Sequence, residues 1–328
     1  MTQQKGSIRL YACGGAGINI GKMLEQFRGV KEPGMGVLDQ VYIDTSHSNA
    51  KGVNPDHSYF FDDMDGSGKV RKENHEEIAA RTREILLKFP PQDLNIVLNS
   101  GSGGSGSVIG PSLVSELLER NLPVVVIMIG TTDTRLEIDN TVKTIKSYEA
   151  IAKLRKTPVA MGYFQNSVAT PRPKVDTLVL QLVSALMTIY SRENSELDSK
   201  DLHNFLHFDL VTTFKPQLAS LLAVNGEFPA HVTTGSVISV ASLAKEGEIT
   251  SLPFVPDYQC TGFLPPDAHE RVQKASPVYL VTVADLPGAA MKELTAALTN
   301  LDEAQRARVQ TAKILNDSDK ATDSGLVF

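Results

Sequence analysis

The first half of the chain alternates short apolar runs with stretches of helical periodicity, and this pattern restricts the possible folds most. The apolar or β-branched runs are IRLYAC (8–13), QVYID (40–44), LNIVLNS (94–100), VVVIMIG (124–130) and VAMGYF (159–164), with helix-like segments at 73–88, 108–120 and 137–154. Continuous apolar strands separated by helices are typical of a parallel α/β sheet covered on both faces. Because ligands bind such sheets at the carboxyl ends of the strands, the loops after these runs are expected to contain the functional residues.

The second half predicts a long helix, a smaller α+β domain and a terminal helix. Segment 173–192 has proline at its start and apolar residues at helical spacing, which predicts a largely buried helix between two domains. Strands are expected near 230–241, 248–255 and 277–284, before a helix over 285–315. The predicted organisation is a nucleotide-binding domain (1–170), a central helix (171–192), a second domain (193–286), a C-terminal helix (287–316) and an acidic tail (317–328).

Composition excludes several classes of protein. No apolar run reaches the roughly 18 residues of a membrane span, and the first residues lack the apolar stretch of a signal peptide. Two cysteines cannot form a disulfide framework. The net charge is −6 and basic residues are scattered, so a basic stripe for nucleic acid is not seen. We therefore expect a cytoplasmic protein without direct nucleic-acid or membrane partners.

The first glycine loop, CGGAGINIG (13–21), directly follows an apolar run and opens a helical stretch. Glycines allow the backbone to approach a ligand closely, and a helix start offers free N–H groups to phosphate. The loop is not a P-loop, because Ala16 stands where that motif needs glycine and Met23 where it needs Ser or Thr. It matches a dinucleotide fingerprint in part, through Gly15 and Gly17, with Asp44 ending the next strand. Alone, the loop predicts phosphate binding without naming the nucleotide.

A second loop of small residues, NSGSGGSGSVIG (99–110), again lies between an apolar run and a helical stretch. A flexible linker is the alternative interpretation, but a linker between a buried strand and its helix would be oddly placed. Small residues can form a concavity of backbone N–H groups, and the hydroxyls of Ser102, Ser105 and Ser107 add donors. Two such loops converging on one ligand predict a triphosphate chain.

Two polar segments complete the candidate site. TTDTRLEIDN (131–140) follows the fifth strand, and Glu137 or Asn140 is positioned to reach ribose hydroxyls, with helix capping by Asp133 or Thr134 as the alternative. Asp198 and Asp201 lie three apart at the entry to a helix, where they would orient a water for attack on phosphate. The alternative for this pair is Asp201 as the N-cap and Asp198 as a solvated surface charge.

Two further candidates do not predict chemistry. His203 and His207 have metal-type spacing but no third ligand nearby, so we expect surface histidines on a helix and no protein metal site. Nothing in the sequence makes Cys13 a nucleophile.

These loops, in this order, resemble the nucleotide and catalytic loops of the tubulin/FtsZ superfamily. The tubulin loop AGQCGNQIG falls on Cys13–Gly21, and the signature GGGTGSG falls on Ser100–Gly106, with serines in place of two glycines and Gly103 in place of the threonine. The motif NxDxxD reads Glu196-x-Asp198-x-x-Asp201. The compact length, the degenerate signature and the acidic tail ending in Phe328 are similar to the phage-encoded tubulin-like proteins, the PhuZ group.

The resemblance implies a Rossmann-like GTPase domain that binds GTP or GDP with Mg²⁺. Asp176 falls where the family reads guanine, and Asp198 and Asp201 fall where it supplies catalytic carboxylates to the neighbouring subunit. It further implies a head-to-tail homopolymer in which the tail contacts the next subunit, and filaments that position phage DNA in the host bacterial cytoplasm. The nucleotide-binding residues it implies are Gly14, Gly15, Ala16, Gly17, Asn19, Asp44, Thr45, Gly68, Gly101, Ser102, Gly103, Gly104, Ser105, Gly106, Thr132, Glu137, Asn140, Asn166 and Asp176.

Three alternatives stay open from the residues. An NAD(P)-dependent oxidoreductase would use the first glycine loop, with Asp44 on the ribose, and would leave the Gly/Ser loop without a role. A scaffold that binds nucleotide and polymerises without turnover is the second. A plasmid-segregation relative of tubulin, the third, would share nearly all of these motifs.

Overall fold

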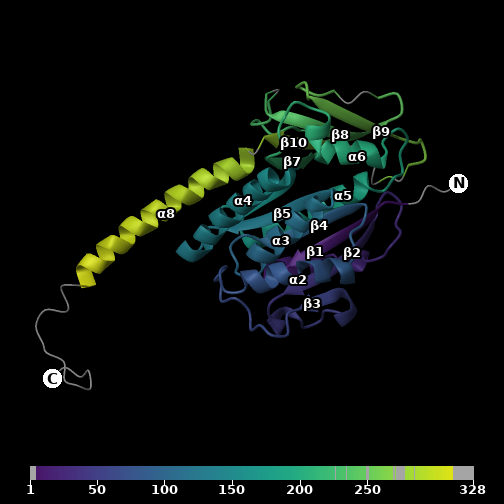
Figure 1. The fold of residues 1–328 in the computed structure, drawn as a ribbon. Coiled ribbons are helices and arrows are strands. Elements are labelled where there is room, and N and C mark those ends of the chain that lie inside the picture. Colours follow the sequence, from purple (N-terminus) through teal and green to yellow (C-terminus); the bar gives the residue numbers. More distant parts are fainter. Residues whose placement is uncertain are drawn as a thin grey trace, which may run out of the picture.

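The computed structural model describes residues 5–225, 227–233, 235–248, 251–268, 270, 278–283 and 285–312. In this part of the chain, ten strands form one sheet in the order β3-β2-β1-β4-β5-β6-β7-β10-β8-β9 (Figure 1). The acidic tail predicted for 317–328 lies outside the described residues. No helix among the described residues has the length and apolar character that crossing a membrane requires.

The first six strands make the parallel half of the sheet. They are β1 (Ser7–Cys13), β2 (Val37–Asp44), β3 (Ser58–Phe60), β4 (Leu94–Ser100), β5 (Val124–Thr131) and β6 (Val159–Asn166). Pairing is parallel throughout, from β3–β2 to β5–β6. The five strands expected from the apolar runs are confirmed, whereas β3 was not predicted.

Side chains of these strands enter two cores, one on each face of the sheet. In β5, Val125 and Ile127 belong to one cluster of buried residues, and Val126 and Met128 to the other. Because successive side chains point to opposite faces, a strand buried on both sides must be apolar at every position. This explains why the apolar runs in the sequence are continuous and do not alternate between apolar and polar residues.

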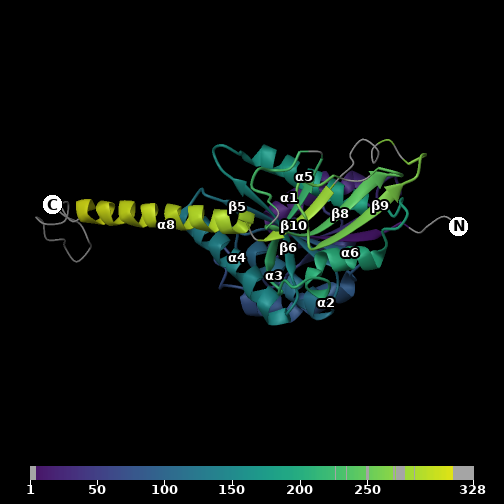
Figure 2. The same ribbon diagram turned by 90° about the horizontal axis from the view of Figure 1, so that it is seen from above.

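Helices cover both faces. α1 (Gly14–Met23) and α5 (Arg172–Ile189) lie on one side of the sheet, and α2 (His75–Lys88), α3 (Gly106–Glu119) and α4 (Arg135–Arg155) lie on the other (Figure 2). The central helix predicted over 173–192 is therefore confirmed as α5, whose buried face includes Val175, Val179 and Val183.

The second half of the chain extends the same sheet. β7 (Leu218–Val224) pairs in parallel with β6, and β10 (Val278–Val283) runs antiparallel between β7 and β8 (Val237–Lys245). β9 (Tyr258–Leu264) pairs in parallel with β8 at the far edge. α6 (Ser199–Leu206) packs on β8 and β9.

One sequence expectation for this half is wrong, and one strand was not predicted. The strand expected near 248–255 is absent from the described residues 251–257, where Pro253 and Pro256 remove backbone donors, and β9 begins at Tyr258 instead. β7 was not predicted, since the apolar run LASLLAV has no feature that separates a strand from a buried helix. β8 begins later than expected, and β10 matches its prediction.

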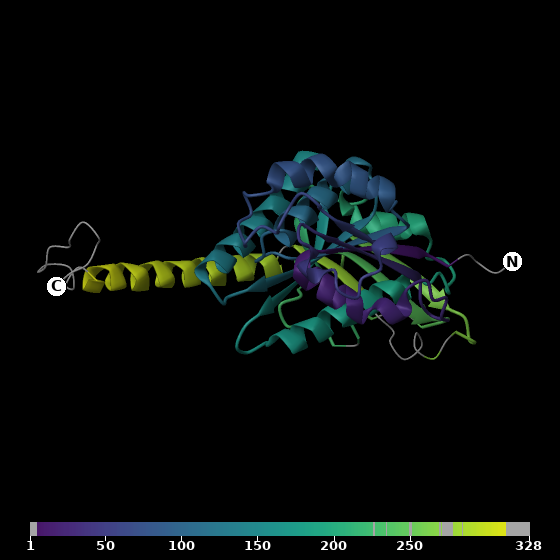
Figure 3. The same ribbon diagram turned by 90° about the horizontal axis from the view of Figure 1, so that it is seen from below.

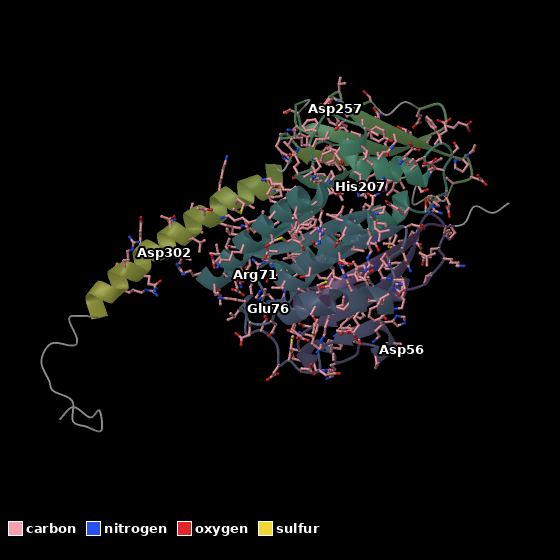
Figure 4. The ribbon with its side chains drawn as sticks, viewed as in Figure 1. Asp56, Arg71, Glu76, His207, Asp257 and Asp302 are labelled. Atoms are coloured by element: carbon pink, nitrogen blue, oxygen red, sulfur yellow. The ribbon has the colours of Figure 1, made fainter. Side chains whose placement is uncertain are left out.

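The terminal helix α8 (Asp285–Ala312) begins against the α4 face and extends beyond the body of the molecule (Figures 1 and 3). Ala290 and Leu294 are buried in the core beneath it. Farther along, Arg135 Nε on α4 lies 2.7 Å from Asp302 Oδ1, on the projecting part of the helix (Figure 4). The long helix predicted for the end of the chain is thus confirmed over its described residues.

Candidate functional site

A cavity of about 460 Å³ lies at the carboxyl ends of β4, β5 and β6. This is the sheet edge at which the sequence predicted a ligand. The residues lining it come from α1, the segment between β3 and α2, the ends of the three strands and the loops after them, the start of α4 and the first turns of α5: Ala16, Asn19, Ile20, Lys69, Ser100, Ser102, Ile129, Thr131, Asp133, Glu137, Asn166, Ser167, Arg172 and Asp176.

The two predicted glycine loops meet backbone to backbone beside this cavity. Gly14 has φ +72°, and a Cβ added to it would lie 2.8 Å from the backbone nitrogen of Gly106. In return, a Cβ on Gly106 would lie 2.7 Å from the carbonyl oxygen of Cys13. No larger residue fits either position without moving a backbone. The structure therefore brings together the two loops that the sequence predicted to converge.

α1 begins directly at Gly14, and no side chain caps its first turn. Its first turns supply Ala16 and Asn19 to the cavity wall. Free N–H groups and the positive end of the helix dipole favour an anion at such a helix start. A phosphate role for this loop stays a prediction, and the helix start is the feature that supports it.

Asp44 and Thr45 support the loops and do not line the cavity. Asp44 is 3% exposed, and its carboxylate accepts hydrogen bonds from Thr45 N and Asn49 Nδ2, both at 2.8 Å. Burial raises the pKa of Asp44, against the opposing effect of these hydrogen bonds. Thr45 Oγ1 lies 2.5 Å from Ser105 Oγ, which connects this segment to the Gly/Ser loop.

Asn140 also supports the loops from behind the cavity. This side chain is 3% exposed, and its Nδ2 donates to the carbonyl oxygens of Lys69 at 2.8 Å and Ser102 at 3.0 Å. One amide group therefore connects the Gly/Ser loop to the segment that contains Gly68 and Lys69. Sequence reasoning had named Asn140 for a ribose contact, a role in which its described hydrogen bonds do not place it.

Glu137 lines the cavity and also takes part in the cap of α4. Thr134 is the N-cap, accepting from Glu137 N at 3.3 Å and donating to Glu137 Oε2 at 2.7 Å. Lys69 Nζ donates to Glu137 Oε1 at 2.6 Å. Burial acts to raise the pKa of Glu137, but the hydrogen bonds from Lys69 and Thr134 outweigh it and the pKa is lowered. Capping by Thr134 is therefore confirmed, whereas contact of Glu137 with ribose stays a prediction; Thr132 does not line the cavity.

The start of α5 forms another wall of the cavity. Asp176 lies there with Arg172, one helical turn earlier, and with Asn166 from the end of β6. Burial raises the pKa of Asp176, while Arg172 acts to lower it. Sequence reasoning named Asp176 and Asn166 but missed Arg172 and Ser167, which were detectable as polar residues after the sixth strand.

The acidic pair lies at the opposite end of α5 from the cavity. With 18 residues, this helix spans about 27 Å. Its end lies beside the amino end of β1, where Gly6 N donates to Tyr190 O at 3.1 Å. Asp198, and not Asp201, is the N-cap of α6: it accepts from Lys200 N at 2.7 Å and Asp201 N at 2.9 Å, and Asp201 at the third helical position completes a capping box. Within one chain, these carboxylates do not reach the cavity.

The expectation of two surface histidines is wrong for His207. Its side chain on the α6 segment is 2% exposed, and neither ring nitrogen has a hydrogen-bond partner among the described residues (Figure 4). The ring of His203 packs against it in an edge-to-face arrangement, with centroids 4.2 Å apart and an interplanar angle of 68°. Burial lowers the pKa of His207 to about 3, so this imidazole is neutral. Its neighbours Leu206 and Phe208 are buried too, which was the signal in the sequence.

The fold is the one found in solved structures of the tubulin/FtsZ class. The structure matches FtsZ from M. jannaschii with a TM-score of 0.63 at 14% identity, covering 85% of this chain and 91% of that one. It matches the phage tubulin PhuZ with GDP with a TM-score of 0.80 at 21% identity, covering 98% and 99%. These likenesses confirm the predicted fold.

Relatives with higher sequence identity identify a narrower family within this class. The chain is 30% identical over 333 residues to the phage tubulin-like protein of Pseudomonas phage phiKZ, covering 98% of each. It is 29% identical to that of Pseudomonas phage PhiPA3, covering 97% of this chain and 98% of the relative. The protofilament of TubZ from bacteriophage PhiKZ matches with a TM-score of 0.76 at 29% identity, covering 98% and 99%. No family model matches the sequence. The chain belongs to the phage tubulin-like proteins, which confirms the resemblance inferred from its loops.

Proposed function

We propose that this chain is a GTPase that binds GTP in the cavity beside the two glycine loops and polymerises head-to-tail into filaments. The observation that carries the proposal is the backbone contact between Gly14 and Gly106, which joins two phosphate-type loops at one cavity. This chain is similar to one phage protein solved as a protofilament and to another solved with GDP.

Guanine selection is assigned to Asp176. A carboxylate accepts hydrogen bonds from both N1–H and the amino group of guanine, whereas adenine offers no such pair of donors. Asp176 lies on the cavity wall formed by α5, and Asn166 lines the same cavity. The ribose is then assigned to the wall that contains Glu137, and the phosphates to the glycine loops.

Hydrolysis is assigned to Asp198 and Asp201 of a neighbouring copy. The pair lies at the far end of α5, so a second chain stacked head-to-tail would bring it to the cavity of the first. Such a heterologous contact does not close on itself and therefore generates a filament. Phosphoryl transfer depends mainly on positioning and electrostatics, which two carboxylates beside a water supply. The tail, 317–328, is assigned to the same contact.

Mg²⁺ belongs to the proposal as a ligand of the phosphate oxygens. It prefers oxygen ligands and keeps several waters, and the carboxylates of Asp133 and Glu137 line the same cavity. The ion would neutralise charge on the phosphate chain. The biological role proposed is positioning of phage DNA in the host cytoplasm, without direct binding to nucleic acid or membrane.

The oxidoreductase alternative loses its main support. That reading assigned the ribose to Asp44, but both carboxylate oxygens of Asp44 accept internal hydrogen bonds and the residue is outside the cavity lining. The Gly/Ser loop would again lack a role. We therefore retain the GTPase.

Right-angle light scattering after addition of GTP or ATP, across a series of protein concentrations, tests the proposal. Released phosphate is followed in the same samples. A GTP-selective rise above a threshold concentration, with phosphate release starting at that threshold, is the expected result. Scattering without phosphate release would identify a scaffold without turnover, and phosphate release independent of protein concentration would contradict a site shared between subunits.

A further inference from the structure

The loop that joins β6 to α5 presents an apolar side chain to solvent. Val168 is fully exposed (104%), more than any other large apolar side chain among the described residues. The loop is closed beside it, because Ser167 N donates to Thr170 O at 3.0 Å and Thr170 N donates to Ser167 Oγ at 3.1 Å. A β-branched side chain on a closed loop loses little conformational freedom when a partner covers it. Val168 is therefore suited to anchor a contact.

A hollow of about 1110 Å³, here called the end pocket, lies at the other end of α5. Its walls come from Lys5 at the start of the described chain, the segment Arg192–Ser195 that follows α5, and the residues at the end of β9. Phe263 and Pro265 belong to its apolar part. Backbone hydrogen bonds of 2.9 and 3.0 Å join Ser195 to Phe263 and fix two of these walls to each other. The end pocket is thus a built hollow with room for an apolar side chain.

The unpaired charges of the two surfaces are opposite in sign. Each basic residue that lines the end pocket pairs with a carboxylate, at distances of 2.7 Å and 3.1 Å. Glu246 and Asp267 of the same pocket are exposed, and neither forms an ion pair with a described residue. Lys174, exposed in the first turn of α5 close to the Val168 loop, is likewise unpaired within the described part of the chain. The end pocket therefore favours a basic surface such as this one.

The proposed head-to-tail contact would bring the two surfaces together. Ser195 of the pocket wall precedes Asp198 by three residues, a backbone span of at most about 10 Å. Ser167 lines the nucleotide cavity, and Val168 is the next residue. A copy that brings Asp198 to the cavity of its neighbour therefore also brings its end pocket to the neighbour's Val168.

We propose that Val168 of one copy inserts into the end pocket of the next copy and anchors the head-to-tail contact. This inference rests on the proposed function and names, for that contact, an apolar anchor distinct from the catalytic carboxylates. Lys174 of the first copy then lies toward Glu246 and Asp267 of the second. Because Val168 does not line the nucleotide cavity, its loss weakens assembly without weakening GTP binding.

Two measurements on the same variants test the anchor. Light scattering with GTP gives the threshold concentration for assembly, and calorimetry below that threshold gives the affinity for GTP. Val168→Ser should raise the threshold about tenfold, the loss expected for one valine side chain that is no longer buried, and should leave GTP affinity unchanged. Val255→Ser, at a 75% exposed valine outside both linings, should change neither quantity. An unchanged threshold in Val168→Ser would overturn the inference.

Cysteine cross-linking identifies the contact directly. Both natural cysteines are buried, so a bis-maleimide reagent reports on introduced cysteines. In the presence of GTP, a chain with both Val168→Cys and Pro265→Cys should give a ladder of covalent oligomers. A mixture of the two single variants should give covalent dimers, and each single variant alone should give no product.

The outcomes separate this inference from the proposed function. Filaments that give no cross-linked product, or products from one single variant alone, would overturn the Val168 contact while the GTPase proposal stands. The end pocket would then have another occupant. Failure of the unmodified chain to assemble with GTP would overturn the proposed function, and this inference with it.

Discussion

A pair of substitutions at Asp198 separates helix capping from catalysis. In the structure, the Asp198 carboxylate accepts from Lys200 N at 2.7 Å and from Asp201 N at 2.9 Å. Asp198→Ala removes both hydrogen bonds and should lower the free energy of unfolding by about 1 kcal/mol, the usual cost of losing an N-cap. Asp198→Asn keeps a side-chain oxygen at the cap, so the loss should stay within about 0.5 kcal/mol, mostly from the helix dipole.

The two variants should be alike in catalysis. Hydrogen bonds from the backbone of Asp201 and Lys200 lower the pKa of Asp198, so the group is a carboxylate near neutral pH. Asparagine preserves the cap but has no negative charge to orient an attacking water. We expect assembly-linked phosphate release to fall about 100-fold or more in both variants, the usual range for a positioned acid or base.

Urea unfolding gives the stability of each variant, and phosphate release per assembled chain gives the activity. Light scattering in the same samples verifies that filaments form. The reasoning is refuted if Asp198→Asn releases phosphate at the unmodified rate while Asp198→Ala is slow. Asp198 would then act only by capping α6, and the catalytic carboxylate would have to be sought elsewhere.

Three further predictions concern pH, packing and base selection. The pKa of His207 falls from 6.5 to about 3 on folding, so the unfolded chain binds the proton first and stability is lost as pH falls below 6.5. The contribution of His207 to this loss should reach about 2 kcal/mol at pH 5, and His207→Leu should remove that part of the slope in urea unfolding, while His203, whose pKa burial also lowers, keeps its own part. Gly106→Ala, whose Cβ would lie 2.7 Å from Cys13 O, should weaken GTP binding about tenfold or more in calorimetry, whereas Gly288→Ala, with no atom within 4 Å, should not. Asp176→Asn should lower GTP affinity about tenfold and erase the preference for GTP over ATP in competition assays; unchanged preference would refute its role.

The parallel half of the fold was predictable because a strand that is buried on both faces of the sheet appears in the sequence as an uninterrupted run of apolar residues. The five long strands of that half were found in this way. β3 spans Ser58–Phe60 and is too short to form such a run. β9 was misplaced because apolar residues near Pro253 resembled a strand, although proline cannot donate to a strand ladder.

The loops that form the candidate site were predictable from the sequence, but the role of each residue in them was not. Glycine spacing identified the two loops, since a backbone contact such as Gly14 with Gly106 excludes other residues. Sequence reasoning names Asp44 and Asn140 as contacts of the ligand. In the structure, their side chains instead form hydrogen bonds within the protein that support the loops. The sequence shows which residue type stands at each position. Whether that residue lines the cavity or supports a loop depends on the direction and burial of its side chain, which the sequence does not show.

The single sheet has a mechanical consequence. The β6–β7 ladder, which joins its two halves, runs only from Val159–Leu218 to Met161–Ser220, whereas the β5–β6 ladder runs from Val125–Ala160 to Thr131–Asn166. Between the two halves of the sheet, few backbone hydrogen bonds therefore resist a bending load. A filament built from this chain is expected to flex inside each subunit as well as between subunits.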